Sequence, residues 1–118
     1  MAILINSELG EISVNNNVIA QIAGAVATNC YGVVGMASKS TKDGVAKLLM
    51  MENMSRGIKV DVLDNGIVID LHIIVEYGVN INAICDSIIH NVSYRVEKSL
   101  GTAVKNVTVQ VESVRVGE

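Results

Sequence analysis

Three side chains near the middle of the sequence have the residue types and spacing of a metal site. Asp61 lies in one run of alternating apolar and polar residues, and Asp70 and His72 lie in the next run. We expect the two runs to pair as antiparallel strands, with Asp61 opposite Asp70 and Lys59 opposite His72 on the face away from the core. Carboxylates and imidazoles bind divalent cations, so Asp61, Asp70 and His72 form a candidate metal site. The alternative is a solvated polar face, because such a spacing also arises by chance.

A segment rich in lysine and methionine is the candidate site for a partner or an anion. More than half of the nine Lys and Arg residues lie between residues 39 and 59. Flexible methionine-rich surfaces adapt to different partners. Ordinary surface lysines over a small apolar cluster are the alternative. The residues of this candidate site are Lys39, Lys42, Lys47, Met50, Met51, Met54 and Arg56.

One short motif points to nucleic acid. Gly32-Val33-Val34-Gly35 matches the GXXG loop with which KH domains clamp a nucleic-acid backbone. Here the two intervening residues are apolar, no Lys or Arg adjoins them, and the net charge of the chain is −3. Phosphate contacts need cationic side chains. A KH-like nucleic-acid-binding module is therefore the alternative function and not the one we expect.

The elements that would position these residues follow from hydrophobic periodicity. The central one is a strand over Ile67–Tyr77, in which every second residue is apolar. A strand that begins at Ile58 precedes it, and Asn65-Gly66 between them predicts a type I′ hairpin turn. That turn pairs Val62 with Ile69, and it sets the opposite residues given above.

The remaining elements are two long helices, a short helix and three strands. An asparagine precedes each long helix, and its side chain can cap free backbone N–H groups. The valines of the last strand change parity, which predicts a bulge near Glu112-Ser113. The expected strands are Gly10–Val14, Val33–Ala37 and Lys105–Val116, and the expected helices are Val18–Cys30, Gly44–Met54 and Asn82–Leu100.

This order of elements predicts an α+β fold, a small mixed sheet with helices packed on one face. The order is strand, helix, strand, short helix, strand, strand, helix, strand. We expect one domain over residues 1–118, in which residues 1–9 are a disordered leader. Half of the residues are hydrophobic, which suffices for a core in a chain of this length. We expect neither a membrane span nor a secretory signal.

Two stretches resemble the bacterial alkaline-shock-protein family, also called envelope stress response proteins, which includes the YloU-like proteins. They are GEISVNNNVIAQIAGAVATNCYGVVGM and GIVIDLHIIVEYGVNINAICDSIIHNVSYRVEKSLGTAVKNVTVQVESV, which together cover most of the chain between Gly10 and Val116. The family's strand motif I-D-L-x-I-x-V-x-Y-G is present in the second stretch. Asn82-Ala83 departs from the family pattern, where a proline is usual. Cys30-Tyr31 and Leu100-Gly101 are further departures.

The resemblance implies a small non-enzymatic cytoplasmic protein of cell-envelope homeostasis in Gram-positive bacteria. It supplies neither a catalytic residue nor a cofactor, and the sequence carries no catalytic motif of its own. Some family members are held at the membrane by a separate anchor protein. The implied partners are therefore a second copy of the chain or another cytoplasmic or membrane-anchor protein, with membrane association through that partner.

Overall fold

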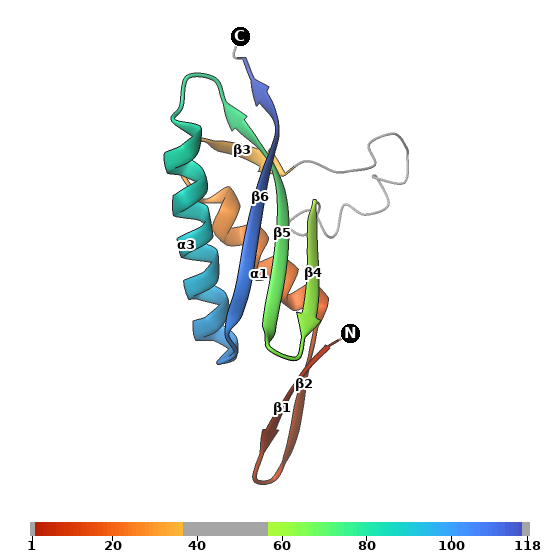
Figure 1. Cartoon of the computed structure of the whole chain (residues 1–118). Coiled ribbons are helices and arrows are strands. Elements are labelled where there is room, and N and C mark those ends of the chain that lie inside the picture. Colours follow the sequence, from red (N-terminus) through yellow and green to blue (C-terminus); the bar gives the residue numbers. More distant parts are fainter. Residues whose placement is uncertain (1, 37–56, 117–118) are drawn as a thin grey trace, which may run out of the picture.

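The computed structural model describes residues 2–36 and 57–116, which form two sheets and two long helices (Figure 1). Helices and strands segregate as the sequence predicts for an α+β fold. The short helix expected over Gly44–Met54 and the whole lysine- and methionine-rich candidate site lie outside the described residues. The elements are β1 (Ala2–Ser7), β2 (Gly10–Asn15), α1 (Asn16–Thr28), β3 (Val33–Met36), β4 (Ile58–Leu63), β5 (Gly66–Glu76), α3 (Ile81–Leu100) and β6 (Val104–Arg115).

Strand β5 is the centre of the larger sheet, as its alternating pattern predicts. β4 pairs antiparallel with the first half of β5, and β3 pairs antiparallel with the second half on the same edge. β6 runs parallel to β5 along the other edge (Figure 1). β5 is therefore covered on both edges, and its side chains alternate between the helix side and the outer face of this sheet.

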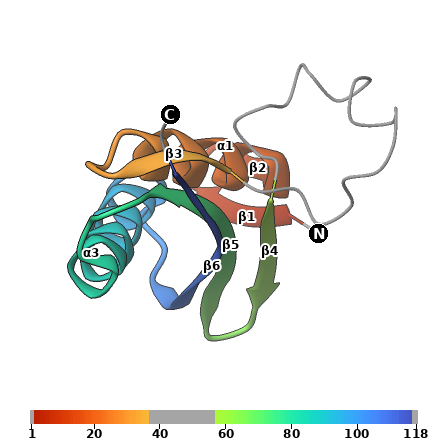
Figure 2. The same cartoon turned by 90° about the horizontal axis from the view of Figure 1, so that it is seen from above.

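Both helices lie against one side of this four-stranded sheet (Figure 2). We call α1, α3 and the four-stranded sheet the body of the protein. The inward side chains of β5 are completely buried beneath the helices, which the predicted alternation requires. The fully buried core side chains are Ile19 of α1, Ile67, Ile69, Leu71, Ile73 and Val75 of β5, and Ile88, Val92 and Val96 of α3.

Asparagine caps begin both helices. The Asn15 side chain accepts a hydrogen bond from the Asn17 backbone N–H at 2.8 Å, and Asn80 accepts one from Ala83 at 3.0 Å. These bonds satisfy N–H groups that have no partner within the first turn of a helix. Gly101 ends α3 with φ of +71°, a backbone conformation that favours glycine.

The turn between β4 and β5 differs from the prediction. Val62 pairs with Ile67 rather than with Ile69, so the register is shifted by two residues and the loop is Asp64-Asn65. No described residue other than glycine has a positive φ, which excludes a type I′ turn. Gly66 instead begins β5 with φ of +143°, where an added Cβ would lie 3.1 Å from the Ala103 carbonyl oxygen. A shift of two residues keeps every side chain on its face, so the apolar pattern could not distinguish the two registers.

The predicted bulge in the last strand is present. Ile73 pairs with Val111, but Ile74 pairs with Ser113, so Glu112 is the extra residue of β6. A bulge leaves one residue unpaired and redirects its side chain. Glu112 has the parity of Gln110, which lies opposite His72, and its side chain reaches the outer face of the sheet beside β5.

The segment expected to be a disordered leader contains a strand, β1. β1 pairs antiparallel with β2 from Ala2 opposite Asn15 to Ser7 opposite Gly10. This two-stranded sheet is separate from the larger one and extends beyond it (Figure 1). We call this hairpin, residues 2–15, the arm.

Candidate functional site

His72 is buried, although the sequence predicts that it lies on the face away from the core. Only 7% of the residue is exposed. Its backbone N–H donates to the Gly57 carbonyl oxygen at 2.9 Å, at the point where β5 passes from β4 to β3. β4 pairs with β5 up to Leu71, and β3 pairs with it from Ile73 onward. His72 therefore lies between the two neighbouring strands on one edge of β5.

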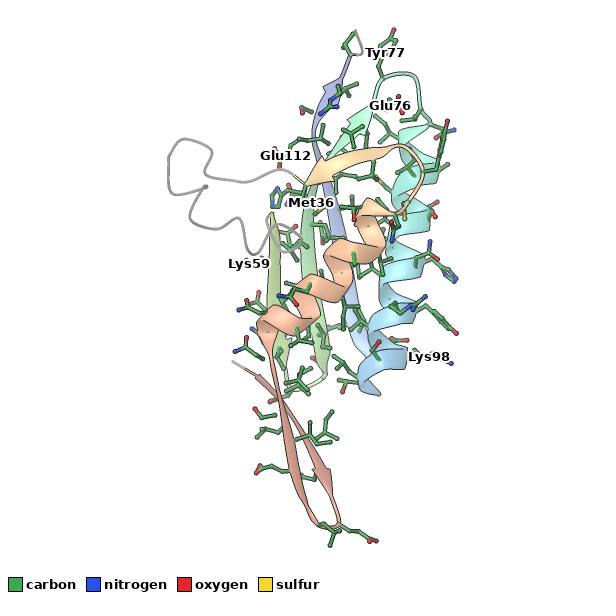
Figure 3. The ribbon with its side chains drawn as sticks, turned by 180° about the vertical axis from the view of Figure 1, so that it is seen from behind. Met36, Lys59, Glu76, Tyr77, Lys98 and Glu112 are labelled. Atoms are coloured by element: carbon green, nitrogen blue, oxygen red, sulfur yellow. The ribbon has the colours of Figure 1, made fainter. Side chains whose placement is uncertain are left out.

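Two carboxylates contact the His72 ring from opposite sides. Nδ1 lies 2.6 Å from Glu112 Oε2, and Nε2 lies 3.6 Å from Asp70 Oδ2. The Gln110 side chain donates a hydrogen bond of 3.0 Å to the other oxygen of Asp70. Glu112 and Lys59 lie on β6 and β4, on either side of β5 (Figure 3). We call His72, Asp70, Glu112 and Gln110 the histidine cluster.

The structure brings together only part of the predicted metal site. Because the register of β4 is shifted, Asp61 lies opposite Val68, and Lys59 lies opposite Asp70. Among residues 2–36 and 57–116, no group of three His, Cys, Asp or Glu side chains is arranged to hold a metal ion. Glu112 was not predicted to be a neighbour of His72. The alternation of the last strand was the signal that could have found it, because Glu112 has the opposite parity to Val107, Val109 and Val111.

The arm carries an apolar surface that becomes more exposed toward its tip. Pairing of the two strands places Ile3, Ile5, Ile12 and Val14 on one face. Ile3, next to the body, is 5% exposed, whereas Ile12 is 52% exposed. Leu4 on the opposite face is 60% exposed, and Leu9 at the tip is 99% exposed. Large apolar side chains therefore lie in solvent on both faces and at the end of the arm.

Comparison with known proteins identifies the family. The model of the alkaline shock protein 23 family, described as having a cell envelope-related function, matches residues 4–116. The chain belongs to this family. It is 43% identical to the uncharacterized protein YloU of Bacillus subtilis, with 98% of each chain covered. It is also 38% identical to an uncharacterized protein of Streptococcus pyogenes, covering 98% of this chain and 97% of that one.

A more distant relative carries a name that refers to a stress response. A protein of Streptococcus pyogenes named as a stress response regulator gls24 homolog is 28% identical to this chain. The similarity covers 92% of this chain and 61% of that protein. The resemblance to the alkaline-shock family inferred from the sequence is therefore confirmed.

The glycine motif of this alkaline-shock family chain does not form a nucleic-acid clamp. Val33 and Gly35 belong to β3, where they pair with Val75 and Ile74 of β5. Gly32 precedes the strand, and its carbonyl oxygen accepts a hydrogen bond from the Glu76 backbone N–H at 2.9 Å. The GXXG segment of KH domains is a loop whose backbone approaches nucleic acid. Here the corresponding residues are engaged in a sheet.

A pocket lies between α1 and α3. It has a volume of about 410 Å³ and includes Cys30 of the α1–β3 connection and Arg95 of α3. The second cysteine, Cys85, is also on α3, and burial raises the pKa of its thiol, with a further rise from the Asp86 carboxylate. Both cysteines are free. Neither helix that the structure describes is long and apolar enough to cross a membrane.

Proposed function

We propose that this chain is a non-enzymatic cytoplasmic protein that serves the cell envelope by binding other proteins through its arm, with a second copy of the chain as the first partner. The observation that carries the proposal is the exposure of Leu4, Leu9 and Ile12 in an element that extends from the body. The family description supports it, because it names a cell envelope-related function and no reaction.

A two-stranded arm of this kind has little to stabilise it by itself. Isolated two-stranded hairpins are marginally stable in water, and their outer edges present backbone groups that can pair with another strand. The inner half of the arm packs on the core through Ile3, with Ile5 and Val14 partly buried beside it. Its outer half has no such support from the described part of the chain. Covering that half with a partner would bury apolar surface and pair strand edges.

The charge of the arm favours a protein partner over a lipid surface. The charged residues between positions 2 and 15 are Glu8 and Glu11, which lie at or near the tip. Anionic membrane surfaces attract clusters of lysine and arginine and repel carboxylates. A second copy suits the arm because two arms can lie antiparallel, with the acidic tip of each beside the base of the other. A membrane-anchor protein is the other partner class, and it would bring the chain to the membrane.

Light scattering on matched variants tests this proposal. The variant Leu4→Asp with Ile12→Asp places two carboxylates on the exposed apolar positions of the arm. The control, Asn6→Asp with Ser13→Asp, adds the same charge at exposed polar positions of the arm. We expect the wild-type chain and the control to form a defined oligomer and the first variant to be a monomer. A wild-type chain that stays monomeric at high concentration would refute self-association.

A further inference from the structure

A row of polar side chains on α3 lines the pocket between the two helices. Ser87, Asn91 and Arg95 are spaced by four residues, so they follow one another along one side of α3. All three line the pocket of about 410 Å³, and Asn29 and Tyr31 line it from the α1–β3 connection. α1 and α3 lie side by side on the same side of the sheet (Figure 3). The pocket therefore collects hydrogen-bond donors from two separate parts of the chain.

Arg95 gives this pocket a positive charge. No Asp or Glu is among the described residues that line it. All ion pairs between described residues involve His72, so no described carboxylate neutralises the guanidinium group of Arg95. Long side chains of a helix lean toward its N-terminus, which directs Arg95 toward Asn91 and Ser87. A guanidinium group with other donors beside it suits the planar oxygens of a carboxylate or the oxygens of a phosphate group.

The carbonyl oxygens at the end of α1 already have donors. Such oxygens lack partners within the helix, and they attract cations. Here the Thr28 hydroxyl group donates to the Gly24 carbonyl oxygen at 2.9 Å. The Cys30 backbone N–H donates to the Ala27 carbonyl oxygen at 3.1 Å. Arg95 is therefore not needed to satisfy this helix end, and its guanidinium group stays available to a ligand.

The hydroxyl group of Ser87 is also available as a donor. The Asn91 amide donates to Ser87 Oγ at 3.3 Å, so the hydroxyl proton of Ser87 can turn toward a ligand. We propose that the pocket binds a small organic oxyanion, either a carboxylate or a phosphate ester. In this site Arg95 binds the charged oxygens, and Ser87 and Asn29 supply further hydrogen bonds.

A second pocket gives room for an apolar part of the same ligand. It has a volume of about 340 Å³ and shares Val26, Asn29 and Arg95 with the first pocket. Ile22 and Ala25 of α1 line it as well. Sites for small molecules have volumes of about 300–1,000 Å³, with apolar walls and a few polar groups that fix the orientation of the ligand. A ligand with its oxyanion at Arg95 and a small apolar group against Ile22 would use both pockets.

Titration of the ¹⁵N-labelled full chain with phenyl phosphate and with benzoate, followed by NMR, tests the proposal. Each probe carries one oxyanion group and one apolar ring, and benzyl alcohol is a neutral analogue. We expect the anions to shift the amide signals of residues 29–31 and 87–95, and the tighter anion identifies the class of oxyanion. Benzyl alcohol should give much smaller shifts. Inorganic phosphate should bind several-fold more weakly than phenyl phosphate, because it has no ring to place in the second pocket.

Matched variants locate the charge that binds the anion. Arg95→Gln removes the charge and keeps a polar side chain, and we expect it to weaken binding of the anions more than about 10-fold. Lys98→Gln is the control, because Lys98 is a cation of the same helix that lines neither pocket. We expect the control to bind within about twofold of wild type. Arg95→Lys should be intermediate, since an ammonium group cannot bind two oxygens in the fork geometry of a guanidinium.

Three results would overturn the proposed site. The first is an equal loss of affinity in Arg95→Gln and Lys98→Gln, which would show attraction to the surface charge of α3 in general. The second is the absence of amide shifts in residues 29–31 and 87–95 with both anions. The third is binding of benzyl alcohol as tight as that of the anions, which would show that the pockets take an apolar ring without an oxyanion.

Discussion

The arm and the body use the same aliphatic residue types for different purposes. In the body, the inward side chains of β5 are completely buried beneath α1 and α3. In the arm, Leu4, Leu9 and Ile12 are exposed, and only the residues next to the body are covered. The difference shows that apolar content alone does not separate a folding core from a binding surface. What separates them is whether another element of the same chain covers the side chain.

The same substitution, leucine to alanine, should give the largest difference in the free energy of unfolding between the body and the arm. Leu71→Ala deletes a fully buried side chain of β5 and leaves a cavity, so we expect it to lower the free energy of unfolding by about 2–5 kcal/mol. Leu9→Ala at the tip of the arm should change it by less than about 0.5 kcal/mol. Urea denaturation of dilute protein measures both. Similar losses in the two variants would mean that the tip of the arm is packed within a single chain.

Two glycines, one in the body and one in the arm, allow the same comparison of stability. Gly32 has φ of +88°, and an added Cβ would contact the Ile84 side chain. Gly32→Ala should therefore destabilise the body by about 1–2 kcal/mol, since residues with a Cβ are disfavoured in the left-handed region. Gly10 in the arm has no atom within 4 Å of such a Cβ, so Gly10→Ala should be nearly neutral. Thermal denaturation followed by circular dichroism measures both, and an equal loss for Gly10→Ala would show that the arm is as tightly constrained as the body.

The two helix caps test whether the arm contributes to the stability of the body where the two parts join. Asn80 caps α3 within the body, whereas Asn15 is both the last residue of β2 and the cap of α1. Replacing a capping asparagine by alanine costs about 1 kcal/mol. We expect Asn80→Ala and Asn15→Ala to cost the same amount in urea denaturation, with Asn80→Asp close to wild type because the carboxylate still accepts the bond. A much larger loss for Asn15→Ala would show that the arm contributes to the stability of the body.

The smallest expected effect concerns a cysteine of the body. Burial and the Asp86 carboxylate both raise the pKa of the Cys85 thiol, so less of the reactive thiolate is present near neutral pH. Asp86→Asn should lower that pKa and speed alkylation of Cys85 by iodoacetamide a few-fold. The rate should rise with pH in both proteins, and at a lower pH in the variant. Peptide mass spectrometry measures it, and an unchanged rate would leave burial as the sole cause.

The body could be predicted from the sequence because independent signals agree there. β5 shows a period of two, and α3 shows a helical period bounded by Asn80 and Gly101. The register between β4 and β5 could not be predicted, because a shift of two residues preserves both faces. Gly66 also closely approaches the start of β6, and such a contact between distant parts of the chain is not encoded in the local pattern.

The candidate site was predictable only in part for a related reason. Asp70 and His72 are neighbours on one face of one strand, so their proximity follows from local spacing. Their contacts with Gln110 and Glu112 depend on the parallel pairing of β6 with β5, two strands that the long helix α3 connects. In the arm, β2 was predicted but β1 was not, because the consecutive apolar residues Ile3, Leu4 and Ile5 hide the period of two that marks a strand face. Asp61 was misplaced by the same two-residue shift of register.

Hydrogen–deuterium exchange at several protein concentrations tests the central claim most directly, because the body serves as an internal control. If a second copy covers the arm, amide exchange in residues 2–15 should slow as concentration rises, while exchange in β5 and α3 stays constant. The Leu4→Asp, Ile12→Asp variant should lose that dependence. Arm exchange that is equally fast at every concentration would contradict the account.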